Sequence, residues 1–193
     1  VTILICLLSI TVSSGLFFNT LNDDTLKWFK PTTNFGQANT LAGEKLTGLR
    51  NIILKVDSGQ KNGIYGISFL NKSDNLTQWL KEQKEVTSVF SYTDALREIK
   101  ALILSENNKS ALPTSKEEAS ELGLVYDMSS QSSGIDTNLY NSDRSSLRIV
   151  VALKNLSNNE YIAFEDKIYN WSKASMAEHS VNGSSISLIF AHV

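Results

Sequence analysis

The sequence predicts an α+β domain, with helices lying on one mixed sheet, preceded by a membrane-spanning helix. Two observations carry this prediction. The first eighteen residues, Val1–Phe18, contain no charge, and the polar chain that follows never repeats that character. The remainder contains two strand–helix–strand patterns in tandem, with a long insertion between Thr93 and Asp143.

The apolar opening segment is nearly as long as a bilayer requires. A spanning helix needs roughly 20 mostly apolar residues, and Val1–Phe18 approaches that length before polar residues begin at Asn22. A secretory signal peptide is the alternative, but it would have a basic stretch before its apolar core and a small-residue cleavage site after it. Neither is present. We therefore expect a truncated transmembrane helix at 1–21 and one folded domain at 22–193.

Composition excludes some classes of function. Lys and Arg number 18 against 20 Asp and Glu, which gives a net charge of −2. Nucleic-acid binding favours a basic face, so no nucleic-acid partner is expected. The single cysteine, Cys6, lies in the apolar segment, and a disulfide framework is therefore impossible within the chain.

The first strand–helix–strand pattern begins with the β-branched run Asn51–Asp57, which predicts a strand. Asn62 and Gly63 then predict a turn. In Ser68–Gln83 the apolar residues recur at helical spacings, and Glu85–Tyr92 predicts a second strand. Such a unit implies parallel or near-parallel strands and a helix that crosses over one face of the sheet.

The second pattern repeats the first. Ser146–Lys154 predicts a strand and Asn158–Met176 a helix. Asn182-Gly183 predicts a turn, and Ser185–Val193 predicts a last strand. The helix carries an aromatic-rich stripe, formed by Tyr161, Phe164, Ile168 and Trp171. Two such units in tandem predict a ferredoxin-like βαββαβ arrangement.

The remaining segments are predicted to be helical or irregular. A short helix is expected at Thr40–Leu49, ended by Gly48, and another from Thr93 or Asp94 through Leu104. The pattern Ser115-Lys-Glu-Glu118 is typical of a capping box and begins a helix that should end at Gly123. The Ser-rich segment Asp127–Asn141 is expected to be irregular.

No catalytic or metal-binding constellation is visible in the sequence. The only histidines are His179 and His192, and no metal-ligand spacing, phosphate-binding loop or nucleophile elbow occurs. We expect His179 to be a surface residue at a helix end. The prediction is therefore a protein that is not an enzyme, with no cofactor and no catalytic, cofactor-binding or metal residue.

Two other features have both a plain and a functional interpretation. The acidic pairs Asp23-Asp24 and Glu117-Glu118 fit a solvated face or a helix N-terminus. The aromatic stripe fits a core face, and its alternative role is to line a cleft for hydrophobic cargo. No substrate-binding residue can be assigned from the sequence.

The order of elements and several local patterns resemble one family. The patterns are Asp24–Pro31 (DTLKWFKP), Leu41–Gly48 (LAGEKLTG), the strand Asn51–Val56, the helix Leu70–Lys81, Val86–Val89, Tyr92–Leu96 (YTDAL), the strand Leu147–Leu153 and Val181–Gly183. Together they resemble the large extracytoplasmic loop of resistance–nodulation–division (RND) superfamily exporters of the MMPL type. The resemblance covers nearly the whole chain, although it rests on apolar and turn patterns.

This resemblance implies a proton-driven exporter in the bacterial inner membrane, built from two halves of six membrane helices each. Residues 22–193 would be a porter-type domain on the extracytoplasmic side. Its partners would be the lipid bilayer, hydrophobic or lipid-like cargo and the other half of the transporter. The opening Asp24–Pro31 favours the second half. The proton-carrying residues of that family lie in later membrane helices, so none is carried over to this sequence.

Two alternatives come from other functional classes. A single-pass, membrane-anchored binding or sensor domain would have only one membrane helix. An extracytoplasmic enzyme would need a nucleophile–base pair or a metal site, and neither is visible.

Overall fold

The computed structural model describes residues 30, 32–45, 50–104, 111–133 and 138–185, and the segment 1–21 lies outside them. Among the described residues, no helix is both long and apolar enough to cross a membrane.

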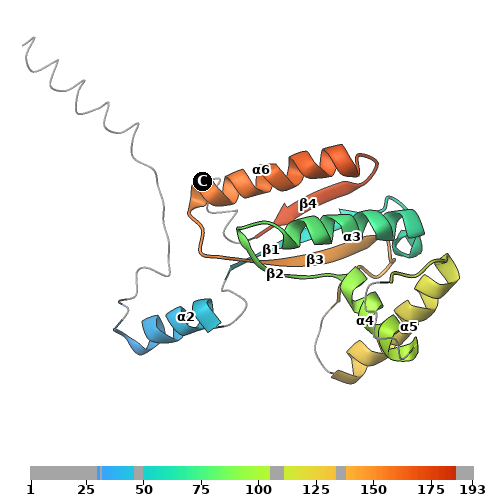
Figure 1. The fold of residues 1–193 in the computed structure, drawn as a ribbon, viewed down its shortest axis with the longest axis horizontal. Coiled ribbons are helices and arrows are strands. Elements are labelled where there is room, and N and C mark those ends of the chain that lie inside the picture. Colours follow the sequence, from blue (N-terminus) through green and yellow to red (C-terminus); the bar gives the residue numbers. More distant parts are fainter. Residues whose placement is uncertain (1–29, 31, 46–49, 105–110, 134–137, 186–193) are drawn as a thin grey trace, which may run out of the picture.

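The fold is α+β (Figure 1). Its elements are α2 (Asn34–Lys45), β1 (Arg50–Asp57), the short 3-10 helix η3 (Gly63–Tyr65), α3 (Ile67–Lys81), β2 (Val86–Phe90), α4 (Tyr92–Leu104), α5 (Lys116–Ser133), β3 (Ser146–Leu153), α6 (Asn158–Ser175) and β4 (Ser180–Ser184).

The four strands form one sheet in the order β2-β3-β1-β4. Each neighbouring pair is antiparallel, so the expectation of a mixed sheet is wrong. The two strands of each strand–helix–strand unit do run parallel, but a strand of the other unit lies between them. The units are therefore interleaved, and every hydrogen-bonded neighbour comes from the opposite unit.

Helices α3 and α6 cover the same face of the sheet, as the two crossovers predict (Figure 1). The buried strand residues beneath them alternate with exposed or half-buried ones, because side chains along a strand point to opposite faces. On β1 the buried residues are Ile52, Leu54 and Val56, which are at most 1% exposed. Their partners across β3 are Val151, Ile149 and Leu147, all buried as well. This face holds the core.

The insertion between β2 and β3 contains the two helices that the sequence predicts, α4 and α5, but the second is longer than expected. The helix α5 runs past Gly123 to Ser133, so the expected end at Gly123 is wrong, and so is the expected irregular structure over residues 127–133. Gly123 is required for a different reason. A Cβ placed there would lie 2.8 Å from the Tyr92 hydroxyl oxygen and 2.9 Å from Cε1 of Tyr65. Two tyrosines therefore approach the α5 backbone directly.

Several predicted boundaries shift. Asn182 and Gly183 lie inside β4, so the expected turn there is wrong, and the predicted last strand falls almost wholly outside the described residues. Tyr92 starts α4 instead of ending β2. The hydroxyl of Ser91 accepts a hydrogen bond from the Asp94 backbone N–H at 3.2 Å, in the manner of an N-cap. The helix α2 begins at Asn34, earlier than expected.

Candidate functional site

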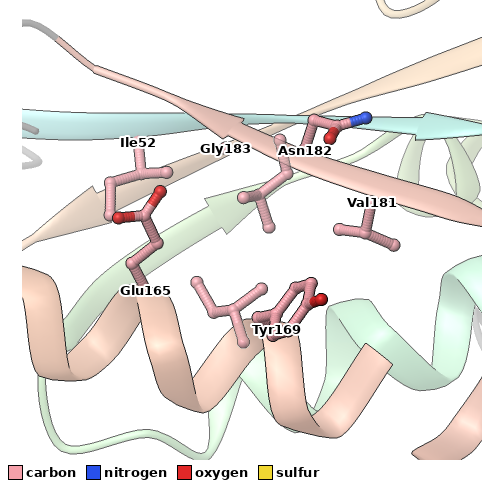
Figure 2. Close-up of a pocket in the computed structure, with 8 residues that line it drawn as sticks. Ile52, Glu165, Tyr169, Val181, Asn182 and Gly183 are labelled. Carbon is pink, nitrogen blue, oxygen red and sulfur yellow. The ribbon is translucent and has the colours of Figure 1, made fainter. Parts of the chain in front are cut away.

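A groove lies between α6 and the β1–β4 edge of the sheet, with a volume of about 190 Å³ (Figure 2). Its lining comes from three elements that are distant in sequence. They contribute Ile52 and Leu54 from β1, Glu165, Ile168 and Tyr169 from α6, and Val181, Asn182 and Gly183 from β4. The groove lies where α6 packs against a short edge strand in which Gly183 carries no side chain.

The floor of the groove is apolar and its helix side is polar. Ile52, Leu54 and Ile168 are at most 4% exposed. Glu165 and Tyr169 rise from successive turns of α6 toward the sheet, whereas the amide of Asn182 points away from the helix (Figure 2). Glu165 is thus the only carboxylate among the lining residues, and the lining has no basic side chain.

The ring of Tyr169 already attracts a cation. Lys173, one turn further along α6, holds its ammonium nitrogen 4.4 Å from the centre of this ring. An ammonium over an aromatic face is attracted by the quadrupole of the ring, by roughly 0.5–1 kcal/mol at an exposed site. Tyr169 is 50% exposed, so the ring is accessible from solvent.

Gly183 sets the depth of the groove. A Cβ built on it would lie 3.5 Å from Leu54 Cδ2, 3.7 Å from Ile52 Cγ2 and 3.8 Å from Glu165 Oε1. These are ordinary van der Waals distances, so a methyl group would fit there without displacing its neighbours. The space beside this glycine is therefore genuinely unfilled.

The predicted aromatic stripe of α6 is mainly a core face. Tyr161, Phe164 and Ile168 are at most 4% exposed, and Trp171 is partly buried and stacks on Trp79 at a centroid distance of 5.3 Å. Only Ile168 of the stripe reaches the groove. The sequence could not indicate the groove, because Glu165 and Tyr169 belong to the neighbouring polar face of the helix.

His179 is not the surface residue that the sequence predicts. Its side chain is 13% exposed, and its ring meets that of Phe69 edge-on at 5.0 Å. Nδ1 is buried and has no hydrogen-bond partner among the described residues. Burial lowers the pKa of His179, and the charge of Lys72 lowers it further, against an opposing effect of Asp57. His179 therefore packs as a partly buried residue between α3 and the start of β4, where burial favours its uncharged form.

Of the acidic pair Glu117-Glu118, Glu118 has a structural role at the N-terminus of α5 and Glu117 is exposed. The Glu118 carboxylate accepts a hydrogen bond from the Thr114 backbone N–H at 2.6 Å and forms an ion pair with Lys100 on α4, also at 2.6 Å. The Lys100 hydrogen bond and then the Thr114 N–H lower the pKa of Glu118 to about 2. Half of the predicted capping box is present, since Ser115 Oγ accepts from the Glu118 N–H. Asp23-Asp24 lies outside the described residues.

The far end of the core, where α4 and α5 pack, holds a cluster of tyrosines. Tyr92 contacts the rings of Tyr126 and Tyr140 edge-on, at 5.5 and 5.3 Å. Burial raises the pKa of Tyr92, and its hydroxyl has no hydrogen-bond partner among the described residues. Arg97 of α4 forms a bidentate ion pair with Asp74 of α3, which links the helical insertion to the rest of the core.

The sheet face opposite α3 and α6 carries an apolar row. Phe90 lies across from Val150, and Val150 across from Ile53, so the three side chains share that face. Phe90 is 48% exposed, and Ile53 and Val150 are half-buried. Lys55 and Arg148, the next same-face pair of β1 and β3, are exposed beside this row. The row is a surface on which another layer could pack.

No protein-family model matches the chain, and no curated protein is detectably similar to it. Among the described residues, no group of three or more His, Cys, Asp or Glu side chains is placed to hold a metal ion. The groove is therefore the candidate site on geometric grounds.

Proposed function

We propose that the chain is part of a proton-driven membrane exporter of the RND superfamily, MMPL type, and that residues 22–193 form its extracytoplasmic, porter-type domain. The observation that carries the proposal is the interleaving of two strand–helix–strand units in one sheet, after an uncharged segment of eighteen residues. The strand order and the shared helix face are those expected of a ferredoxin-like βαββαβ domain with a helical insertion.

In this proposal the groove contacts hydrophobic or lipid-like cargo. Ligand sites are typically concave and mostly apolar, with a few placed polar groups, which fits a floor of Ile52, Leu54 and Ile168 beside Glu165 and Tyr169. The groove holds only part of a lipid-sized molecule, so the rest would extend over α6 or toward the bilayer.

The open sheet face is the surface on which the other half of the transporter would pack. An apolar row such as Phe90, Val150 and Ile53 can slide or rock against a second layer as the membrane helices change conformation. In this way the domain would transfer cargo without modifying it chemically.

The test is export by the complete protein in proteoliposomes, with an imposed pH gradient and a fluorescent lipid analogue as cargo. We expect gradient-dependent export that is lost when residues 50–185 are deleted and when an uncoupler is added. Export that ignores both changes would contradict the proposal. Cargo binding without export would favour the alternative, a single-pass membrane-anchored binding or sensor domain.

A further inference from the structure

We propose that the open sheet face, opposite α3 and α6, docks the exposed side of helix α5 from a second copy of the chain. The contact would join an apolar row to an apolar stripe, with opposite charges beside them. The proposed function requires a second layer on this sheet face, and the inference names that layer, so it rests on the proposed function for the role of the contact. Self-association and export can nevertheless be measured separately.

The open sheet face is apolar across three strands and basic beside them. Its apolar row is Phe90, Val150 and Ile53. Two residues further along β3 and β1, Arg148 lies directly opposite Lys55. Like charges at such a position destabilise a sheet. Lys55 forms an ion pair with Asp57 at 2.9 Å, whereas Arg148 forms none with a described residue. An acidic group on a partner would therefore compensate Arg148.

Helix α5 has the complementary pattern on its exposed side. Four residues at helical spacings form one stripe there: Glu117, Glu121, Leu124 and Met128. Leu124 and Met128 are 57% and 73% exposed, although both side chains are apolar. Neither glutamate forms an ion pair with a described residue. The opposite side of the helix is buried in the core through Ala119, Leu122 and Tyr126.

The two patterns have matching dimensions. Arg148 lies two residues from Val150, which is about 7 Å along a strand. Glu121 precedes Leu124 by three residues and Met128 by seven, which is about 5–10 Å along a helix axis. A helix that lies along the strands can therefore place Glu121 over Arg148 and its apolar side chains over the apolar row.

Two-fold symmetry would close the assembly. Each copy offers one open sheet face and one exposed side of α5, so a two-fold axis lets both contacts form in one dimer. The sheet would then have helices on both faces, which is a common way to cover an apolar sheet face.

The experiment is sedimentation velocity of the full chain in a nonionic detergent, over a series of protein concentrations. We expect a dimer, which Arg148→Glu and Glu121→Lys should each weaken by about tenfold or more, because each variant turns an attraction into a repulsion. An equimolar mixture of the two variants should restore the dimer. In the mixed dimer the reversed charges attract at one contact, and the other contact keeps its original pair.

Control variants separate this contact from other association. Lys61→Glu and Glu98→Lys make the same charge changes at exposed positions outside both surfaces and should leave the dimer unchanged. Leu124→Ser/Met128→Ser should weaken the dimer without changing the circular dichroism spectrum. The N-terminal apolar segment is identical in every variant, so association through it would not follow this pattern. A monomeric wild-type chain, a mixture as weak as its components, or equal losses in the controls would overturn the proposal.

Export measurements keep this inference distinct from the proposed function. If the chain stays monomeric while the complete protein shows gradient-driven export, only the identification of the second layer is wrong. If the dimer forms with this charge dependence while the complete protein exports nothing, the contact stands and the exporter proposal fails.

Discussion

The two ends of the core differ in how completely side chains fill them. At the α4–α5 end, the Tyr92 hydroxyl and the Tyr65 ring lie so close to Gly123 that not even a methyl group fits. At the β4 edge, Gly183 borders open space that would accept the same methyl group without a clash. This difference shows that a glycine can lie either at a tight contact or beside unfilled space. Only the surrounding side chains distinguish the two cases.

The α4–α5 end, which is the filled one, is also linked to α3 by an ion pair. The Asp74–Arg97 pair there is 10% and 15% exposed, so removing one partner leaves the other charge largely buried. We expect Asp74→Ala to lower the free energy of unfolding by about 3 kcal/mol, measured by urea denaturation. The double variant Asp74→Leu/Arg97→Met should recover most of that loss. A small effect of Asp74→Ala would show that this end is not held by the pair.

Overpacking at the filled end should have the next largest effect. Gly123→Ala would push against Tyr92 and Tyr65, and we expect it to lower the free energy of unfolding by about 1–3 kcal/mol. This is opposite in sign to the usual gain of Gly→Ala within a helix. Circular dichroism during thermal unfolding measures it. The double variant Gly123→Ala/Tyr92→Phe should regain part of the lost stability, because it removes the hydroxyl contact and keeps the one with Tyr65. No recovery at all would refute the hydroxyl contact.

The caps of the two helices give a smaller contrast between the ends. At α6 the capping box is complete: Ser157 Oγ accepts from the Glu160 N–H, and the Glu160 carboxylate accepts from the Ser157 N–H at 2.8 Å. Ser157→Ala should lower stability by about 1 kcal/mol. Ser115→Ala should have a smaller effect, because at α5 the reciprocal carboxylate bonds Thr114 instead. Equal losses in chemical denaturation would contradict this difference.

The smallest predicted effect is a dependence on pH at the α4–α5 end. The folded-state pKa of Glu118 is about 2, below its ordinary 4.5, so its contribution is complete above pH 4.5 and is lost as the pH falls through 2. We expect the ionised Glu118 to contribute about 1 kcal/mol to the free energy of unfolding, since its ion pair is partly exposed. Glu118→Gln should flatten this part of the stability profile, whereas the exposed neighbour Glu117→Gln should leave the profile unchanged.

The sequence predicted most of the helices and strands that form the filled part of the core. Apolar periodicity located α3 and α6, and β-branched runs located β1 and β3, because these elements bury one continuous face. Sequence patterns misplaced the element boundaries that depend on contacts with residues distant in sequence. Gly123 suggested a helix end because glycine usually ends helices, but here the tyrosines require it.

The candidate site could not be predicted in the same way. Its lining joins β1, α6 and β4, and the key residue is a glycine that the pattern Asn182-Gly183 presented as a turn. Glu165 and Tyr169 belong to the polar side of an amphipathic helix. The sequence pattern does not show which residues of such a side line a groove. His179 is similarly drawn away from the surface by its contact with Phe69, a tertiary neighbour.

The most direct test of the contrast between the two ends is urea denaturation of the wild-type chain, Gly123→Ala and Gly183→Ala side by side. The account predicts opposite shifts: Gly123→Ala loses stability, while Gly183→Ala gains about 0.4–1 kcal/mol, because it reduces the freedom of the unfolded chain and fills unoccupied space. A loss in Gly183→Ala comparable to that in Gly123→Ala would contradict the account, since the groove would then not be open.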